Sequence, residues 1–385
     1  MNKEKNLDLN YQERLEVNMN LIDNEKYFDD VKRVADTANF EKYKNSSILI
    51  TGASGLICSF LVDVLMYRNN EYNDNIKIYM LCRNEKKLLD RFSSYNVTSA
   101  SENTSNLMYI IQDVCDDFNF DIDFDYIIHG ASNTHPKQYS TDPVGTITTN
   151  IIGMNNILNY CKNHKPKRVF MMSSVEIYGE NRQDTEYFDE NYLGYINCNT
   201  ARAGYPESKR LCEALCQSYI SQYDLDIVIG RLSRVYGPTM LKDDSKALAQ
   251  FIRNALNNED IVLKSEGNQL YSYTHVADAV DAIIYIMNYG YKGEAYNIAD
   301  KNSDIRLKDL ASILASYNNK EVVFELPDEV ERKGYSTATK AIMSSEKINS
   351  IGWYPHYTIE EGLSQTLDIL NDMKEKPVLL QRKQQ

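Results

Sequence analysis

Two short segments carry side chains that could move a proton on a substrate: Ser173-Ser-Val-Glu-Ile-Tyr-Gly179 and Tyr205-Pro-Glu-Ser-Lys209. Tyr205 and Lys209 are four residues apart, so they share one face of the helix that the second segment is expected to open. An ammonium group beside a phenol favours the phenolate, which can act as a base near neutral pH. Tyr205 is therefore a candidate acid–base, and Ser174 could polarise the same substrate oxygen. By itself, the spacing also occurs in solvated Tyr–Lys pairs on many helices.

The segment Ser46-Ser-Ile-Leu-Ile-Thr-Gly-Ala-Ser-Gly-Leu-Ile-Cys58 predicts a strand, a tight turn and a helix that would hold a second ligand near these groups. Gly52 and Gly55 lie in the turn, where a side chain would block the approach of a pyrophosphate to the backbone. The helix that follows directs its free N–H groups and positive dipole end towards that anion. Cys58, at a third position that needs a small residue, is small enough for the helix and strand to pack closely. The pattern indicates a dinucleotide site, whose oxidised nicotinamide would add positive charge beside Tyr205.

Strands and helices alternate after residue 46, with further strands expected at 76–81, 108–111, 126–129 and 168–172. Such alternation is typical of an α/β protein with a parallel, doubly wound sheet. Arg83 follows the strand expected at 76–81, at the place where an acidic residue would hold the ribose hydroxyls of NAD. Arg83 could instead meet the 2′-phosphate of NADP, or be a solvated residue that opens a helix, so the choice between NAD and NADP stays open.

Asp113 comes directly after the strand expected at 108–111 and is a candidate cofactor contact. The other aspartates of the acidic stretch 113–125 predict a solvated surface and not a metal site, because no histidine or calcium-loop spacing accompanies them. We therefore expect no bound metal.

The composition favours a soluble globular protein with a sizeable core, because 43% of the 385 residues are hydrophobic. A formal net charge of −13 argues against nucleic-acid binding, which depends on clustered Lys and Arg that neutralise phosphates. The seven cysteines are odd in number and lie mostly in apolar segments, so we expect reduced, buried thiols. The sequence shows neither a signal peptide nor a run of about 18 apolar residues, which predicts a cytoplasmic protein without a membrane partner.

The two catalytic segments are accompanied by Thr51-Gly-Ala-Ser-Gly-Leu-Ile57, His129-Gly-Ala-Ser132, Arg231-Leu-Ser-Arg-Val-Tyr-Gly-Pro238 and Ala295-Tyr-Asn-Ile-Ala299. Together these motifs resemble the extended short-chain dehydrogenase/reductase family of nucleotide-sugar epimerases, dehydratases and decarboxylases, over about residues 46–370. The resemblance implies a Rossmann-type sheet, a smaller C-terminal lobe that binds a nucleotide sugar, and catalysis by Ser174, Tyr205 and Lys209 with Glu176. The residues it implies as contacts of NAD, or of NADP through Arg83, are Gly52, Ser54, Gly55, Leu56, Ile57, Arg83, Asp113, Val114, Gly130, Ala131, Ser132, Tyr205 and Lys209.

Residues near the reacting carbon distinguish members of this family. The 4,6-dehydratases of the family carry an Asp-Glu pair before the Tyr-Gly motif, and their Asp protonates the leaving hydroxyl. In this sequence Val175 occupies the position of that Asp. Glu176 is kept, whereas epimerases usually carry small uncharged residues there. Arg202 and Arg210 resemble the Arg-x-x-Tyr-x-x-x-Lys-Arg pattern of UDP-glucuronate decarboxylases, and a guanidinium suits a sugar carboxylate. Arg202 could alternatively cap carbonyls of its own loop.

Two positions depart from the family pattern. Arg234 stands where the family commonly has an Asn, and Tyr271 stands where it commonly has an Arg near the diphosphate. Arg234 could therefore supply the displaced charge, and the identity of the sugar and nucleotide stays open. The residues expected to contact substrate are His135, Glu176, Arg202, Arg234 and Tyr271.

The expected organisation is an N-terminal extension over 1–45, a dinucleotide-binding domain over 46–238, a nucleotide-sugar-binding lobe mainly over 239–375 and a tail over 376–385. In related enzymes the helices at 143–163 and 205–223 form a dimer bundle, and a second apolar strip on both favours a homodimer, or simply more core (Val144, Ile152, Leu215 and Tyr219). The predicted function is modification of a nucleotide sugar through a 4-keto intermediate, best matched by UDP-glucuronate decarboxylation. The alternatives are a 4-epimerase, a C4 dehydrogenase or 4,6-dehydratase, and a non-catalytic protein that senses a dinucleotide.

Overall fold

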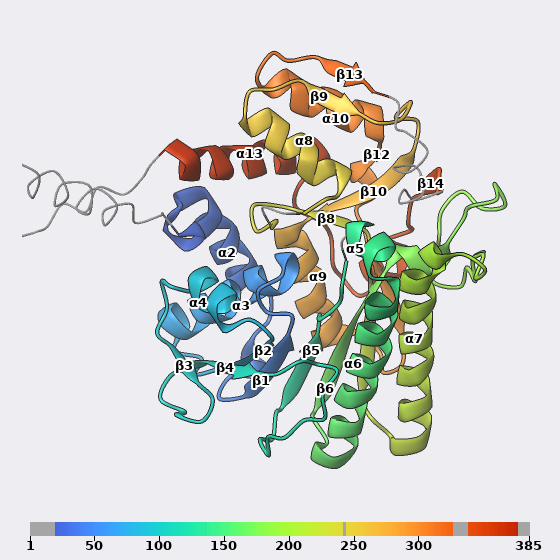
Figure 1. Ribbon diagram of the computed structural model, residues 1–385. Coiled ribbons are helices and arrows are strands. Elements are labelled where there is room, and N and C mark those ends of the chain that lie inside the picture. The colour runs from blue at the N-terminus through green and yellow to red at the C-terminus, as the bar shows by residue number, and fades with distance from the viewer. Residues whose placement is uncertain (1–19, 135, 242–243, 326–337, 376–385) are drawn as a thin grey trace, which may run out of the picture.

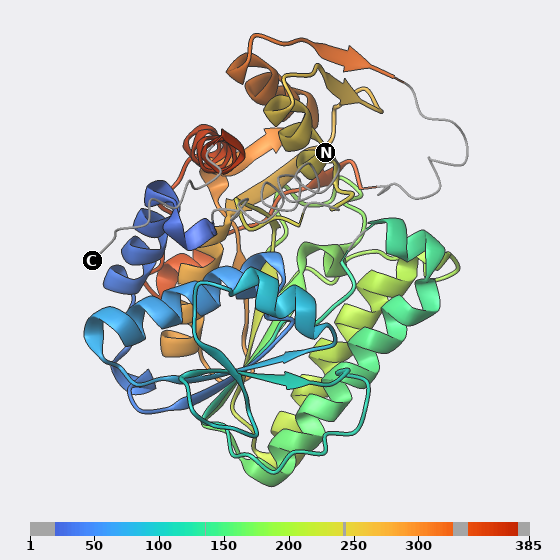
Figure 2. The ribbon, with the colours of Figure 1, turned by 60° about the vertical axis from the view of Figure 1, so that its left-hand side comes forward.

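The computed structural model describes residues 20–134, 136–241, 244–325 and 338–375. They form a large α/β body and a smaller lobe that lies above it (Figure 1). Figure 2 shows helices packed on both faces of the twisted sheet of the large body. The doubly wound α/β fold that the sequence predicts is confirmed. The expected tail over 376–385 and the first 19 residues of the extension lie outside the described residues.

The large sheet has eight parallel strands in the order β11-β7-β6-β5-β1-β2-β4-β3. The order reverses beside β1, because β2 pairs with one edge of β1 and β5 with the other, and such a switch point leaves a crevice at the carboxyl ends of the strands. The edge strand β3 has only three residues, all half-buried, so no apolar pattern marks it and the sequence did not predict it. The strands are β1 (Ser47–Thr51), β2 (Lys77–Cys82), β3 (Val97–Ser99), β4 (Leu107–Ile111), β5 (Tyr126–His129), β6 (Arg168–Ser174), β7 (Ile227–Leu232) and β11 (Ala295–Ile298).

Helices cover the two faces of this sheet and bury separate apolar cores. The long helices α6 (Pro143–His164) and α7 (Gly204–Tyr223) pack side by side on one face (Figure 1). Asp142 caps α6 by accepting a hydrogen bond of 2.9 Å from the N–H of Gly145. None of the helices in the described part of the chain is long and apolar enough to cross a bilayer. The remaining helices of the large body are α2 (Glu25–Thr37), α3 (Leu56–Tyr72), α4 (Glu85–Arg91), α5 (Pro136–Thr141), α9 (Val276–Tyr289) and α12 (Glu346–Ser350).

The N-terminal extension contributes helix α2, which joins the large body to the smaller lobe. It packs against α3 and α9 of the body and against α13 (Ile359–Glu375) of the lobe, and both views show α2 beside α13 (Figures 1 and 2). Arg33 pairs with the buried carboxylate of Asp278 on α9 at 3.0 Å, and Lys26 pairs with Asp368 on α13. Burial removes water from a carboxylate, and an ion pair with a cation offsets that cost. The extension that supplies Arg33 is therefore an integral part of the fold.

The smaller lobe is built on a four-stranded sheet with its own apolar core. Strands β8 and β10 pair in parallel, with Arg234 opposite Tyr273. This pairing places Arg234 on the lobe side of the crevice. The elements of the lobe besides α13 are β8 (Arg234–Tyr236), β9 (Ile261–Leu263), β10 (Leu270–His275), β12 (Asp304–Arg306), β13 (Val322–Phe324), β14 (Lys340–Ala341), α8 (Ala247–Leu256) and α10 (Leu307–Tyr317).

Candidate active site

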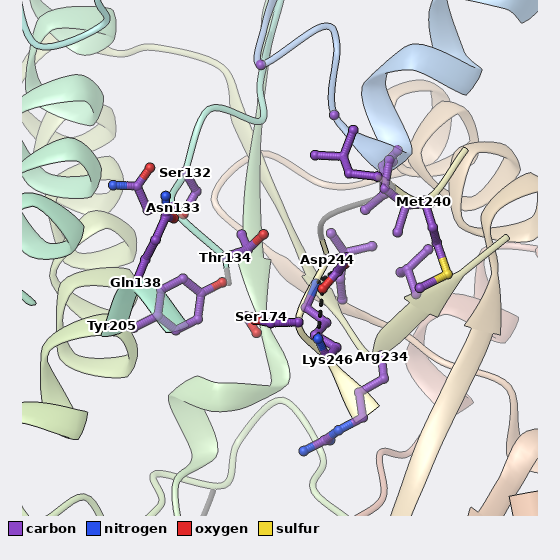
Figure 3. A pocket seen from close by; sticks show the side chains of 18 of the residues that line it. Ser132, Asn133, Thr134, Gln138, Ser174, Tyr205, Arg234, Met240, Asp244 and Lys246 are labelled. Atoms are coloured by element: carbon purple, nitrogen blue, oxygen red, sulfur yellow. Dashed lines mark hydrogen bonds and ion pairs between the residues drawn. The ribbon is translucent and has the colours of Figure 1, made fainter. Parts of the chain in front are cut away.

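A cavity of about 750 Å³ lies between the carboxyl ends of the large sheet and the smaller lobe. Figure 3 shows Tyr205 and Ser132 on one wall, Arg234 and Lys246 on the opposite wall, and Ser174 between them. The predicted Lys209 does not line the cavity, and the predicted His135 lies outside the described residues. The predicted residues that line it are Gly52, Ser54, Gly55, Leu56, Ile57, Arg83, Asp113, Val114, Gly130, Ala131, Ser132, Ser174, Glu176, Arg202, Tyr205, Arg234 and Tyr271.

The turn between β1 and α3 forms a cradle in which position 52 has no room for a side chain. Gly52 has a φ of +70°, and an added Cβ would lie 2.9 Å from backbone atoms of Gly130 and Ala131. Gly55 precedes α3 and offers no side chain to cap the helix, so the first N–H groups of α3 remain free. Free N–H groups and the positive end of a helix together bind phosphate anions. The cradle therefore fits the pyrophosphate of a dinucleotide.

Cys58 packs against the loop that follows β5. A Cβ added to Gly130 would lie 2.5 Å from the Sγ of Cys58, and this Sγ donates a hydrogen bond to the carbonyl of Thr51 at 3.6 Å. Burial raises the pKa of the Cys58 thiol to about 12, so it stays protonated. Cysteine thus occupies the third small position of the turn as a packing residue, which is why α3 and the sheet approach closely.

The far end of the cradle carries a mostly exposed ion pair. Arg83, which follows β2, lies 3.4 Å from Asp113, and the same carboxylate accepts a hydrogen bond from the N–H of Cys115 at 2.9 Å. Lys87 lines the cavity nearby, on the first turns of α4. The structure therefore places two cations at the carboxyl end of β2, where no acidic side chain follows the strand.

Tyr205 lies at the start of α7 with its ring almost completely buried. Burial raises its pKa to about 12, although hydrogen bonds with Ser174 and Ser132 and the charge of Arg202 lower it. Lys209 donates a hydrogen bond to the carbonyl of Met172 at 2.9 Å, and its Nζ lies 6.0 Å from the centre of the Tyr205 ring. The protein's own groups thus keep Tyr205 protonated, and the expected phenolate depends on the positive charge of an oxidised nicotinamide.

Glu176 and Arg202 form an ion pair of 2.7 Å, and their charges act on Tyr205. They come from two short 3₁₀ helices, Val175–Tyr178 and Ala201–Ala203, that lead out of β6 and into α7. The guanidinium of Arg202 also lies 4.8 Å from the ring centre of Tyr139, which stacks on Tyr205 at 4.9 Å. The Nε–H of Arg202 is buried and has no hydrogen-bond partner in the described part of the chain. Arg202 therefore pairs with a carboxylate of the site and keeps one donor free.

Arg234 and Tyr271 meet on the wall formed by the lobe. The guanidinium carbon of Arg234 lies 3.4 Å from the ring centre of Tyr271, a close cation–π contact. The hydroxyl of Tyr271 donates a hydrogen bond to the carbonyl of Ala338 at 2.7 Å, which holds the ring in place. Nearby, Lys246 pairs with Asp244 at 3.6 Å (Figure 3). The two departures from the family pattern are thus neighbours in space.

Several cavity residues were not predicted, because nothing in their local sequence marks them. Tyr139 and Gln138 follow β5 on the short helix α5, and the side-chain oxygen of Gln138 is buried without a hydrogen-bond partner among the described residues. No group of histidine, cysteine and acidic side chains that could hold a metal occurs in the described ranges. Other unpredicted polar residues that line the cavity include Lys87, Asn133, Thr134, Asp244 and Lys246.

The sequence model of the NAD dependent epimerase/dehydratase family matches residues 48–299. The chain belongs to this family. The expected membership of the extended short-chain dehydrogenase/reductase family, and with it an enzyme that uses a nicotinamide dinucleotide, is therefore confirmed. The family match begins after α2, so the N-terminal helix is an addition to the family core.

Two UDP-glucuronic acid decarboxylases are similar over most of the chain. UDP-glucuronic acid decarboxylase 3 of Arabidopsis thaliana is 30% identical over 323 residues, which cover 83% of this chain and 87% of the relative. UDP-glucuronic acid decarboxylase 1 of Danio rerio is 26% identical over 325 residues, 83% of this chain and 71% of the relative.

Solved structures show the same fold at lower identity. UDP-glucose 4-epimerase of Thermotoga maritima with UDP-glucose has a TM-score of 0.70 at 22% identity and covers 86% of this chain and 100% of the epimerase. UDP-glucuronic acid 4-epimerase of Bacillus cereus in complex with UDP-glucuronic acid and NAD has a TM-score of 0.70 at 22% identity, covering 85% of this chain and 99% of that chain.

Proposed function

We propose that this enzyme decarboxylates a UDP-linked hexuronate, using NAD or NADP that it reduces and reoxidises within one turnover. The observation that carries the proposal is the ion pair of Glu176 and Arg202 beside Tyr205, with the apolar Val175 at the end of β6. Arg202 places a cation beside the reacting centre. Position 175 carries no acidic side chain that could protonate a leaving hydroxyl. The similarity to UDP-glucuronic acid decarboxylases supports the same reaction.

Arg202 makes a substrate carboxylate acceptable in this part of the cavity. A second carboxylate near Glu176 would be repelled, but Arg202 neutralises Glu176 at 2.7 Å. The free Nε–H of Arg202 can then donate to the sugar carboxylate as a charge-assisted hydrogen bond. Arg202 therefore serves two carboxylates, one from the protein and one from the substrate.

Tyr205 takes the proton of the C4 hydroxyl while Ser174 holds the same oxygen and a hydride leaves C4. The bound nicotinamide supplies the acceptor for this hydride and later its donor. As the bond between C5 and the carboxylate breaks, CO2 departs and the electron pair of that bond moves into an enolate of the 4-ketone. A proton from water then adds at C5 and restores the ketone. Tyr205 returns its proton to the C4 oxygen as the hydride comes back to C4. The reaction therefore consumes no oxidant overall.

The direct test is an incubation of the purified protein with UDP-, dTDP-, GDP- and CDP-sugars, including hexuronates, followed by mass spectrometry. We expect a product lighter by CO2 from a UDP-hexuronate, with a transient nicotinamide absorbance. A 6-deoxy-4-keto product from a neutral sugar, or inversion at C4 without loss of CO2, would contradict the proposal.

Arg202→Met separates the role of the guanidinium from general damage. We expect it to cost about 2–5 kcal/mol for the acid sugar, because the carboxylate loses its partner in a partly buried site. Arg210→Met is the matched control, since Arg210 lies just after Lys209, pairs with Glu207 at 3.9 Å and does not line the cavity. In the double variant Arg202→Met/Glu176→Gln no unpaired carboxylate is left at position 176. A loss greater than that of Glu176→Gln alone therefore belongs to the substrate carboxylate.

We also propose a homodimer formed through α6 and α7. Val144 and Ile152 on α6 are 69% and 41% exposed, and Leu211 on the adjacent α7 is 45% exposed. Exposed apolar side chains on two neighbouring helices are typical of an interface. Light scattering should give the mass of two chains, and a monomer at micromolar concentration would exclude this arrangement.

A further inference from the structure

The strongest unassigned feature of the cavity is Arg234, a cation that lies over an aromatic ring and has no counter-ion among the described residues. Arg234 lies on β8, which pairs with β10, and its guanidinium carbon lies over the ring of Tyr271, 3.4 Å from the ring centre. Tyr271 is only 7% exposed and is fixed by its hydrogen bond to Ala338. A guanidinium stacked in this way is held in one orientation, while the N–H groups along its edge remain available.

Carboxylate partners distinguish Arg234 from three other cations around the cavity. Three other cations that line the cavity have a carboxylate partner: Arg83 pairs with Asp113, Arg202 with Glu176 and Lys246 with Asp244. Arg234 has no carboxylate within ion-pair distance among the residues that the structure describes, and its Nη1 is buried without a hydrogen-bond partner. A buried cationic donor without a partner is unfavourable, so the missing acceptor is expected to come from a ligand.

The position of Arg234 indicates which part of a ligand it meets. Figure 3 shows Arg234 and Tyr205 on opposite walls of the cavity, so Arg234 belongs to the lobe and not to the reacting centre. The cradle for a dinucleotide pyrophosphate lies elsewhere, in the turn of Gly52 at the end of β1. A planar guanidinium presents paired N–H groups that match the oxygens of a phosphate.

We infer that Arg234, oriented by Tyr271, binds the diphosphate of the nucleotide sugar. This inference rests on the proposed function, because it assumes a nucleotide-linked substrate. It assigns the phosphate contact to a pair of neighbouring side chains on β8 and β10, one of which supplies the charge and the other the platform. A guanidinium placed at position 271 would reach the same region, since the two side chains are in contact.

Calorimetry on the full-length protein tests the assignment without relying on turnover. The ligands are UDP, dTDP, GDP and CDP, each compared with its nucleoside, and NAD. Wild-type protein should prefer one nucleoside diphosphate over its nucleoside. Arg234→Met should weaken that diphosphate about tenfold to a hundredfold, leave the nucleoside within about threefold and leave NAD unchanged. Tyr271→Leu should cause part of the same loss, and Tyr271→Arg added to Arg234→Asn should restore most of the affinity.

The outcomes separate this inference from the proposed function. If wild-type protein binds no nucleoside diphosphate, a nucleotide-sugar substrate and the inference are both wrong. If it binds one and Arg234→Met binds it equally well, only the inference is wrong. If Lys246→Met loses the preference for the diphosphate over its nucleoside and Arg234→Met keeps it, Lys246 makes the contact and the inference is wrong. A loss confined to UDP-hexuronate would place Arg234 at the sugar carboxylate. Circular dichroism and thermal unfolding of each variant show whether it is folded.

Discussion

The two halves of the cavity present different groups to a ligand, backbone in one half and side chains in the other. The dinucleotide half is mostly backbone: the turn of Gly52 and Gly55, the N-terminus of α3 and the loop at Gly130. The substrate half is mostly side chains, which come from the 3₁₀ helices around Glu176 and Arg202 and from strands β8 and β10. A site made of backbone depends on a few residues close together in sequence. A site made of side chains can exchange residues between neighbouring positions.

Arg234 and Tyr271 illustrate that freedom. Their side chains touch although they are 37 positions apart in the chain, so a charge that leaves one strand can be supplied from the other. No comparable exchange is open to Gly52, because an added Cβ would meet the backbone of Gly130.

The largest effect is expected where the two halves meet, at Tyr205. Tyr205→Phe removes only the hydroxyl, so turnover should fall at least about a hundredfold, the usual scale of general acid–base catalysis, while NAD and nucleotide affinity stay nearly intact. Single-turnover absorbance of the nicotinamide and calorimetry measure the two quantities separately. Wild-type turnover in this variant would show that the proton is moved by another group.

Backbone geometry in the dinucleotide half predicts the next effect. Gly52→Ala places a side chain at a φ of +70° and 2.9 Å from backbone atoms, which should lower the free energy of unfolding by about 1–3 kcal/mol and weaken NAD binding. Gly55→Ala is the matched control. Gly55 has a φ of −82°, and its added Cβ would meet only the carbonyl of Gly52, at 3.1 Å. Urea unfolding that ranks the two variants equally would refute the argument from geometry.

The smallest effect is expected at Arg83, one of the few charged side chains in the dinucleotide half. Because Arg83 is mostly exposed and pairs weakly with Asp113, Arg83→Ala should weaken NADP by only about tenfold and leave NAD unchanged. Fluorescence titration with both cofactors measures the ratio, and Lys87→Ala shows whether the second cation shares the phosphate. Equal weakening of NAD and NADP would mean that Arg83 contacts no 2′-phosphate.

Much of the fold could be predicted because its signals are local. The strands expected at 76–81, 108–111, 126–129 and 168–172 appear within two residues of those bounds as β2, β4, β5 and β6. Long apolar strands alternating with helices leave few topologies other than a parallel sheet. The missed strand β3 is short and half-buried, and only its pairing with β4 makes it a strand.

The candidate site divides in the same way. The spacing of Gly52 and Gly55, and of Tyr205 and Lys209, depends on one turn and one helix, so the sequence alone indicated both. That Lys209 would donate to the carbonyl of Met172 could not be predicted, because the partner lies on another element. The ion pair of Arg202 with Glu176 was also hidden, since the sequence offered only a substrate carboxylate or loop carbonyls as partners.

By itself, the sequence determined the family, the parallel sheet and the chemistry available at Tyr205, because each follows from residue types at short spacing. Only the tertiary structure decided which charges are paired, since the partners of Arg202, Arg234 and Arg33 come from segments distant in the chain. Electrostatic energy depends on separation in space and on burial, and neither quantity is contained in the order of residues. Among the described residues the buried Nη1 of Arg234 has no hydrogen-bond partner, which is a consequence of that packing, and our inference assigns this donor to the substrate diphosphate.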